Sequence, residues 1–305
     1  MIEPVVFCAG FALIAVGAVS FIYPLRWLRI RTRGVGLLVL AAGFLLVAIG
    51  GEMFDSYLVY LGFALFFAGL IPLIRPLRFL SIRNRPWALA IASMGLLVSL
   101  GALLWPYGNK EAATHITKLD DWMPRWQVEE RHTLEVAAAP DKVFAAIRAV
   151  RADEILLFRT LIAIRRCGQS GGPENILNAP EGKPLLDVAT QTTFVLLEEE
   201  APRELVVGTV IAAPRVALAA GRLTPEFFRK ALPPGVVLAT MNFVVEPRTD
   251  GGSTVSTETR IHANSPAALR QFGIYWRLIH PGSDIIRRMW LRAIKQRAER
   301  EDPPR

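Results

Sequence analysis

The sequence predicts two structural domains. The first is an α-helical membrane domain of four transmembrane helices, built as a duplicated two-helix hairpin, and the second is an α+β domain with a curved antiparallel sheet and a long C-terminal helix. Three observations support this prediction: four long apolar runs before residue 106, two short basic loops with matching sequences between them, and strand-like alternation after residue 126. The chain of 305 residues is 52% hydrophobic, and its mean hydropathy of +0.34 is high for a soluble protein.

The four apolar runs are predicted to cross a membrane. Each is about 20 residues long, which at roughly 1.5 Å per residue matches a bilayer core of about 30 Å. None contains Asp, Glu, Lys, Arg or His. A helix that is apolar on all sides must be buried in lipid or in protein. The predicted spans are residues 4–23, 34–51, 56–74 and 87–105.

The basic residues of this region predict its orientation. All eight Lys and Arg residues of the first 106 positions lie in two short loops, and residues 24–33 (PLRWLRIRTR) align with residues 76–85 (PLRFLSIRNR) at an offset of 52. Positive charge in short loops favours the cytoplasmic side. We therefore expect both loops in the cytoplasm, with the N-terminus and the C-terminal domain outside, as in a multi-pass protein of a bacterial inner membrane.

The same loops are expected to contact lipid headgroups. Aromatic rings favour the membrane interface, and arginines pair with headgroup phosphates. Structural anchoring and recognition of a particular anionic headgroup both fit this pattern. The residues assigned to the interface are Arg26, Trp27, Arg31, Arg33, Arg78, Phe79, Arg83 and Arg85.

Glycines recur every seven residues along the spans, as at Gly36 and Gly43 or Gly62 and Gly69. Seven residues are close to two helical turns, so each pair lies on one helix face, where small residues let helix backbones approach closely. A tight helical bundle is therefore expected. A channel or transporter is not, because a transport path requires ionisable residues or broken helices at mid-membrane.

The second domain is expected over residues 126–300, after a polar linker at 107–125 and before a short tail at 301–305. A helix should begin at Pro140, since proline fits a first helical position. A hairpin signal, Arg248–Gly252, joins the last two predicted strands. The remaining predicted elements are a strand at 126–137, a helix at 153–166, strands at 187–198, 203–213, 235–247 and 253–263, and a helix at 266–300 interrupted at Pro281.

Two segments resemble the START-like helix-grip (SRPBCC, polyketide cyclase-like) superfamily: His132–Phe144 (HTLEVAAAPDKVF) and Ser256–Ile261 (STETRI), the latter followed by the long helix. The resemblance covers about residues 126–300. It implies a curved sheet that grips the last helix around an apolar cavity for lipids, sterols or polyketides, and some members catalyse cyclisation or hydrolysis. Ordinary core packing is the alternative for each expected lining residue: Phe158, Leu161, Thr192, Phe194, Met241, Phe243, Phe272 and Trp276.

Catalytic signals are weak, and we assign no catalytic residue, metal ligand or cofactor. Ser170 fits a G-x-S-x-G pattern but lacks the strand-to-helix turn that this motif needs. The histidines, at 115, 132, 262 and 280, have no zinc-binding spacing. Glu258, Arg260 and His262 share one face of the last strand, either as acid, clamp and base or as a solvated face. Neither a phosphate-binding loop nor a nucleic-acid surface is evident.

Three functions fit these observations. The first is a membrane-anchored, non-catalytic domain that binds or transfers a lipid-like hydrophobic or amphipathic molecule. The second is an interaction or assembly protein whose protein partner the sequence does not identify. The third is a cyclase- or hydrolase-type enzyme that uses Glu258, His262 or Tyr275. We favour the first, because a cavity-forming fold follows a helical region without transport features.

Overall fold

The computed structural model comprises two compact units: residues 1–106 with 273–280, and residues 107–272 with 281–305. Helix α10 (Pro266–Ala298) contributes to both of them. The structure describes residues 13, 16, 17, 19, 20, 30, 32–49, 54–74, 85–165, 175, 176, 178–214 and 223–300.

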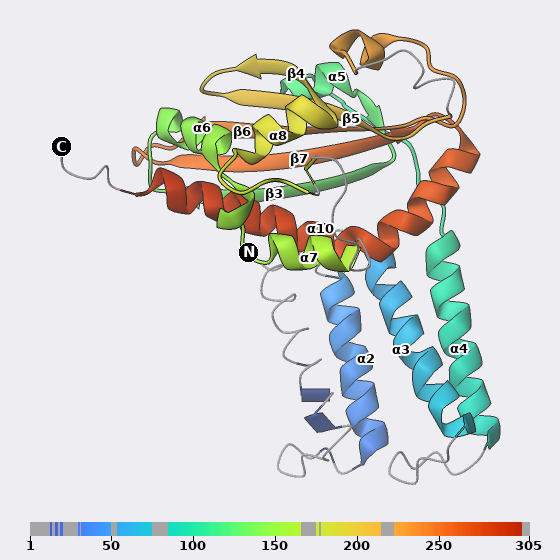
Figure 1. The fold of residues 1–305 in the computed structure, drawn as a ribbon. Coiled ribbons are helices and arrows are strands. Elements are labelled where there is room, and N and C mark those ends of the chain that lie inside the picture. Colours follow the sequence, from blue (N-terminus) through green and yellow to red (C-terminus); the bar gives the residue numbers. More distant parts are fainter. Residues whose placement is uncertain are drawn as a thin grey trace. The chain divides into compact units, whose positions relative to one another are not determined.

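The first unit is helical, as predicted, with helices α2 (Arg33–Ile49), α3 (Phe54–Ile74) and α4 (Arg85–Leu104) (Figure 1). Among the described residues, α3 alone is both long and apolar enough to cross a membrane, and the apolar stretches of α2 and α4 are shorter. Most of the predicted span at 4–23 lies outside the described residues. Of the four predicted membrane spans, one is therefore a clear candidate among the described residues.

Glycines bring α3 and α4 into backbone contact. A Cβ atom on Gly69 would lie 2.4 Å from the Ala92 nitrogen, and one on Gly95 would lie 2.3 Å from the Phe66 nitrogen. No real side chain fits at such distances, so the two helices approach as closely as glycine allows. The close packing predicted from the glycine spacing is confirmed for this pair.

Arg277 of α10 joins the ends of α3 and α4 within the first unit. Its side chain is 2% exposed, and its Nε donates to Asp55 Oδ2 at 2.5 Å. Its Nη1 and Nη2 donate to the carbonyls of Leu103 (3.1 Å) and Trp105 (2.7 Å). The last carbonyls of a helix lack intrahelical partners and favour a cation, so one guanidinium satisfies the end of α4 and the carboxylate of α3.

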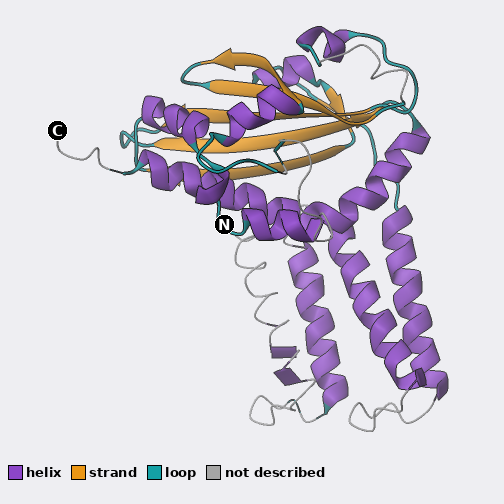
Figure 2. Cartoon of the chain, in the orientation of Figure 1, coloured by secondary structure: helices purple, strands orange, loops and turns teal. Residues whose placement is uncertain are grey.

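The second unit contains an antiparallel sheet, whose strands are orange in Figure 2. It has five strands in the order β3-β7-β6-β5-β4. The first of these strands pairs with the last, with Val128 opposite Ile261. The predicted hairpin between β6 and β7 is confirmed. The strands are β3 (Val128–Val136), β4 (Phe194–Glu200), β5 (Glu204–Ala212), β6 (Val237–Pro247) and β7 (Ser253–Ala263).

The main core lies on one face of this sheet. There the sheet packs against α6 (Pro140–Ala149), α7 (Phe158–Arg165), α8 (Leu185–Thr192) and the C-terminal part of α10. Phe243 and Trp290, in an edge-on contact at 5.2 Å, are central to this core. Smaller apolar clusters on the opposite face involve the short helices α5 (Lys118–Trp122) and η4 (Pro225–Arg229).

Three predicted elements differ from the structure. The strand expected at 187–198 is in part α8, because Leu185, Leu186, Val188 and Ala189 form one buried helical face, and the strand begins only at Phe194. The helix expected at 153–166 is divided into η3 (Ala152–Glu154) and α7, with a left-handed residue between them.

The third difference concerns the last helix, which continues through Pro281 instead of being interrupted there. Proline removes one helical hydrogen bond, but the helix need not end where its flanking turns are held by packing.

The segment expected as a linker, residues 107–125, is folded. It contains β1 (Lys110–Glu111) and α5, and β1 pairs with β2 (Arg125–Trp126). Leu119 and Met123 are buried against the sheet. The polar composition of this segment predicted a linker, because the few apolar side chains that anchor it to the sheet are widely spaced.

Candidate functional site

A cavity of about 310 Å³ lies on the sheet face that residues 111–126 cover. Strands β3, β6 and β7 contribute Arg131, Asn242, Val244, Glu246, Ser256, Glu258 and Arg260, and the covering segment contributes Glu111 to Thr114, Ile116, Thr117, Asp120 and Trp126. Charged, hydroxyl and apolar side chains therefore surround one space. We call this space the Arg260 pocket.

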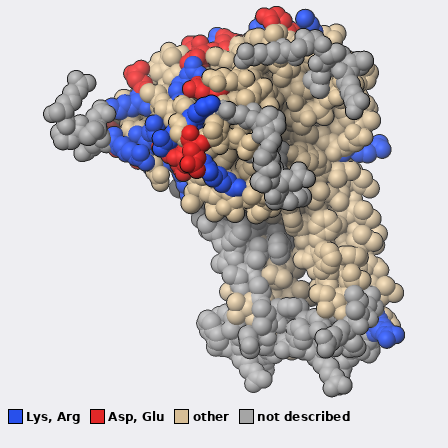
Figure 3. Space-filling model, viewed as in Figure 1, with Lys and Arg blue, Asp and Glu red and all other residues tan. Residues whose placement is uncertain are grey.

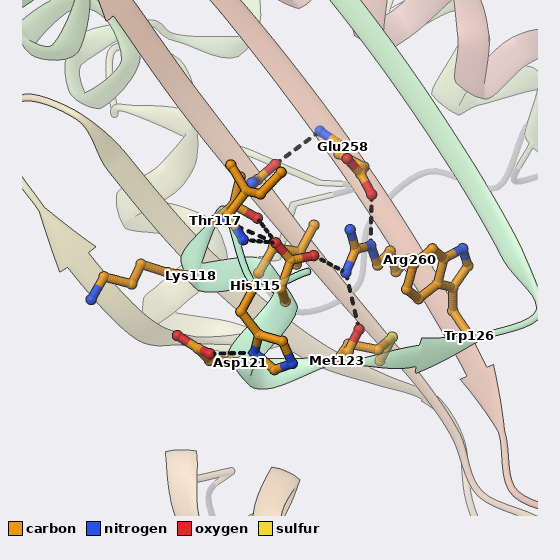
Figure 4. Close-up of polar contacts among 12 residues, drawn as sticks. His115, Thr117, Lys118, Asp121, Met123, Trp126, Glu258 and Arg260 are labelled. Carbon is orange, nitrogen blue, oxygen red and sulfur yellow. Dashed lines mark hydrogen bonds and ion pairs between the residues drawn. The ribbon is translucent and has the colours of Figure 1, made fainter. Parts of the chain in front are cut away.

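Arg260 is fixed by four contacts, although it is only 6% exposed. Its Nε donates to Glu258 Oε1 at 2.6 Å, and its Nη1 contacts Asp120 Oδ1 at 2.7 Å and the carbonyl of Met123 at 3.2 Å (Figure 4). The guanidinium carbon lies 3.8 Å from the centre of the Trp126 ring. Such a cation–π contact and paired charge-assisted hydrogen bonds make Arg260 a rigid wall of the pocket.

Asp120 connects Arg260 to the covering segment. Its Oδ2 accepts hydrogen bonds from the backbone nitrogens of Ile116 (2.9 Å) and Thr117 (2.8 Å) and from the Thr117 hydroxyl (2.9 Å). Burial raises the pKa of the Asp120 carboxyl, but the hydrogen bonds from Thr117, Arg260 and Ile116 outweigh it and hold this pKa below its ordinary value. Asp120 is therefore an anion at neutral pH and closes a capping box with Thr117.

A second buried carboxylate holds α5 onto the sheet. Glu204 of β5 is 2% exposed and accepts hydrogen bonds from the backbone nitrogens of Lys118 (2.8 Å) and Leu119 (3.2 Å). It also accepts one from Asn242 Nδ2 at 2.7 Å, and Asn242 Oδ1 accepts from the Glu258 nitrogen at 3.0 Å. The wall of the pocket and its cover thus share one hydrogen-bond network.

Some polar groups of the pocket are available to a ligand. Arg131 is exposed and makes no ion pair within the described part of the chain. Glu258 gives Oε1 to Arg260, whereas the described residues provide no partner for its Oε2. Ile116 and Val244 supply apolar surface beside them. The pocket can therefore accept a small molecule with an apolar part and a polar, preferably anionic, end.

The residues expected to line a cavity lie elsewhere. Phe158, Met241 and Phe243 are buried in the main core, and Phe194 packs against it. Leu161 is half-buried on α7. Thr192 lies in the last turn of α8, where its hydroxyl donates to the Val188 carbonyl at 2.6 Å. Phe272 belongs to the second unit and Trp276 to the first, and both are buried.

The expected interface residues are described only in part. Arg33 is the first residue of α2, and Arg85, which is exposed, is the first residue of α4. Arg26, Trp27, Arg31, Arg78, Phe79 and Arg83 lie outside the described residues, as does Ser170.

The triplet Glu258, Arg260 and His262 divides in the structure. The first two form the pocket wall, so the expectation of a solvated face does not hold for them. His262 is half-buried and 3.4 Å from Gln127 Nε2. Burial, with a smaller contribution from Arg125, lowers the pKa of the His262 imidazole. It is not among the residues that line the pocket.

The sequence patterns do not indicate Asp120, Trp126 or Glu204 as site residues. The available signal was the pair Thr117 and Asp120, whose spacing of three fits a capping box and indicates a helix start within the supposed linker. Nothing in the sequence indicates that Glu204 caps that helix, because it lies 86 and 85 positions away from its backbone partners Lys118 and Leu119.

On the opposite face of the sheet, Glu130, His132 and Asp284 form a compact group whose ligand atoms all lie within 4.8 Å of one another.

Comparison of the chain with protein families, with curated proteins and with solved structures gives no match. A function for this chain must therefore be argued from its own geometry.

Proposed function

We propose that this chain is a multi-pass membrane protein whose second unit, of the helix-grip type, binds a small amphipathic ligand in the Arg260 pocket without transforming it. The observation that carries this proposal is the pocket itself. Its volume of about 310 Å³ falls at the lower end of the range of roughly 300–1,000 Å³ typical of small-molecule sites. Its buried network holds the wall in place before any ligand arrives.

The membrane part of the proposal is supported by exposed apolar side chains. Phe67, Leu97 and Leu104 are 54%, 66% and 59% exposed on α3 and α4, together with other large apolar residues of these helices. On the face seen in Figure 3, few charged side chains lie on the described part of these helices. Water would not favour such a surface, so we propose lipid as its surroundings, with four spans and with both basic loops in the cytoplasm.

The helix-grip part is supported by the topology of the sheet. The strand that opens the sheet, β3, pairs with β7, and the long helix that follows β7 packs on the sheet through Trp290, Leu291 and Ile294. This is the arrangement that the resemblance of residues 132–144 and 256–261 implies. The described residues on that face form a buried core, whereas those on the other face line a cavity, so we place the ligand on the other face.

We propose an amphipathic ligand because the pocket is lined by both charged and apolar side chains. Arg131 offers a cation to an anionic end, the Glu258 Oε2 atom accepts a hydroxyl or amine, and Ile116 and Val244 contact an apolar part. A ligand that is apolar throughout would leave these polar groups desolvated without partners, which is costly.

The test measures binding of octanoate and, as its oppositely charged counterpart, octylamine to the full-length protein in nanodiscs. We expect saturable octanoate binding that exceeds octylamine binding and that Arg131→Ala weakens. Ser256→Trp, which fills the pocket, should abolish it, whereas Arg292→Ala, a change at an exposed arginine of α10, should leave it unaltered. Equal binding by wild type, Ser256→Trp and empty nanodiscs would contradict the proposal.

The alternative function is a membrane-anchored interaction or assembly protein. The packing of buried side chains around Phe243 and Trp290 favours it, because a well-packed core makes the domain a rigid scaffold. A catalytic function has less support. Of Glu258, His262 and Tyr275, only Glu258 lines the pocket, and one of its oxygens is held by Arg260.

A further inference from the structure

Three side chains of the second unit, buried between the sheet and α10, offer ligands of the kinds that transition metals prefer. Glu130 and His132 project from β3, and Asp284 comes from α10. Glu130 is 1% and His132 7% exposed, and the Asp284 side chain is 15% exposed. We propose that these three residues bind one divalent metal ion of the zinc class, at a site separate from the Arg260 pocket.

The distances within this group fit one shared ion. His132 Nε2 lies 2.9 Å from Glu130 Oε1 and 3.6 Å from Asp284 Oδ1. Zinc binds histidine nitrogen and carboxylate oxygen at about 2.0–2.2 Å, so two ligands at a tetrahedral angle lie about 3.4 Å apart. The two measured distances bracket this value. The same imidazole nitrogen faces both carboxylates, as required if all three converge on one ion.

Thr259 is a second, independent observation that points to a ligand. Its side chain is buried at 4% exposure, and its Oγ1 has no hydrogen-bond partner among the described residues. The register of β3 and β7 places Thr259 directly opposite Glu130, so both side chains project from the same face. A buried hydroxyl without a partner is costly. A metal ion, or a water on it, would satisfy that hydroxyl.

Neighbouring groups position the carboxylates. The Ser283 hydroxyl donates to Glu130 Oε2 at 2.9 Å, which leaves Oε1 directed at His132. Arg288 Nε contacts both oxygens of Asp284 at 3.0–3.1 Å, and Arg287 Nε lies 3.7 Å from Glu130 Oε2. Outer contacts of this kind orient metal ligands. Arg287 and Arg288 also neutralise part of the negative charge of the two carboxylates. The affinity for a metal ion should therefore depend strongly on the His132 imidazole.

The imidazole decides the class of metal. Imidazole suits zinc, copper, iron and nickel, whereas magnesium and calcium prefer sites made of oxygen alone. One histidine with two carboxylates and a nearby hydroxyl therefore favours zinc over magnesium. Without a metal, the same residues would form a polar cluster in which the His132 imidazole contacts both carboxylates. The two possibilities differ in metal content and can be separated by experiment.

The test uses the full-length protein, stripped with a chelator and titrated with zinc chloride by calorimetry. We expect one zinc ion per chain, with magnesium failing to compete. Cobalt substituted for zinc should give a visible absorption spectrum of a protein-bound ion. Because loss of an outer contact alone weakens metal sites by roughly 10–100-fold, loss of the ligand in His132→Ala should weaken zinc binding by about a hundredfold or more.

The matched control is His115→Ala. His115 pairs with Asp121 at 2.7 Å, but both side chains are about half exposed, so this pair reproduces the histidine–carboxylate contact without the site. Asp284→Asn removes a carboxylate ligand but keeps the shape of the side chain. It provides the second test of zinc binding if His132→Ala does not fold. Less than about a tenth of an equivalent of zinc in wild type, or equal affinity in wild type and Asp284→Asn, would overturn the proposal.

Discussion

At the scale of single residues, Arg277 illustrates how one buried cation can stabilise several elements. Its guanidinium contacts the Asp55 carboxylate and the carbonyls of Leu103, in the last turn of α4, and Trp105, just beyond it. A buried arginine is tolerated only where its donors are satisfied, and removing one partner of such a pair leaves the other uncompensated.

Arg277→Leu should therefore lower the stability of the protein by about 3–5 kcal/mol, the range measured for broken buried ion pairs. The measurement is the shift in Tm of the full-length protein in detergent. Arg292→Leu, at an exposed position, should change Tm little. Asp55→Asn combined with Arg277→Leu should lose less than the sum of the single changes, and strict additivity would contradict a direct pairing.

Asp120 gives the Arg260 pocket a defined response to acid. Its carboxyl pKa is lowered from the ordinary 3.8, so the unfolded chain takes up the proton more readily than the folded one. The ionised Asp120 carboxylate therefore contributes its full stabilisation above pH 3.8, the pKa in the unfolded chain. This stabilisation is lost as the pH falls below 3.8 and through the lower pKa of the folded state.

Asp120→Asn should remove that part of the acid dependence and should also destabilise the protein at neutral pH, by about 1–3 kcal/mol for the lost charge-assisted contacts. Thermal unfolding curves recorded between pH 6 and about pH 2.5, followed by tryptophan fluorescence, provide the measurement, because the Trp126 ring contacts Arg260. A wild-type and a variant profile that run parallel over this range would rule out the assigned role.

At the scale of elements, the contact of α3 with α4 depends on where glycine is needed. Gly95 lies against the backbone of Phe66, whereas a Cβ on Gly101, six residues further along α4, would meet nothing within 4 Å. The two glycines are therefore a matched pair within one helix.

Gly95→Ala should force the helices apart and lower Tm, while Gly101→Ala should leave Tm unchanged or raise it, since alanine favours a helix over glycine by about 1 kcal/mol. Thermal stability in detergent is again the readout. Equal effects of the two substitutions would show that α3 and α4 are not in backbone contact in the protein.

The segment at 107–125 shows what sequence patterns can and cannot predict. The strands β6 and β7 and the glycine contacts were predictable, because alternation, a turn motif and a seven-residue spacing are local signals. The covering helix α5 depends on Glu204 and Asn242, which are distant in sequence and polar, so no local pattern indicates them. Arg260 could be named as a candidate from its place on the last strand. Its partners in the covering segment could not, because they lie far from it in the sequence.

At the scale of the whole molecule, the charge of the two basic loops predicts the side of the membrane on which the second unit lies. Alkaline phosphatase fused after Arg305 should be active, and green fluorescent protein at the same position should be dark in a bacterial host, because the C-terminal domain is expected outside. Fluorescence without phosphatase activity would reverse the predicted orientation and place the Arg260 pocket in the cytoplasm.

The pairing of the first sheet strand with the last has a consequence for synthesis. Within the described sheet, β3 pairs only with β7, so the edge of β3 that bonds to β7 stays unpaired until Ala263 has left the ribosome. In contrast, α3 and α4 are neighbours in sequence and can pair early. Nascent chains that end before Ser253 should therefore be cut readily by protease within β3. That edge of β3 is therefore exposed for most of the time it takes to make the second unit.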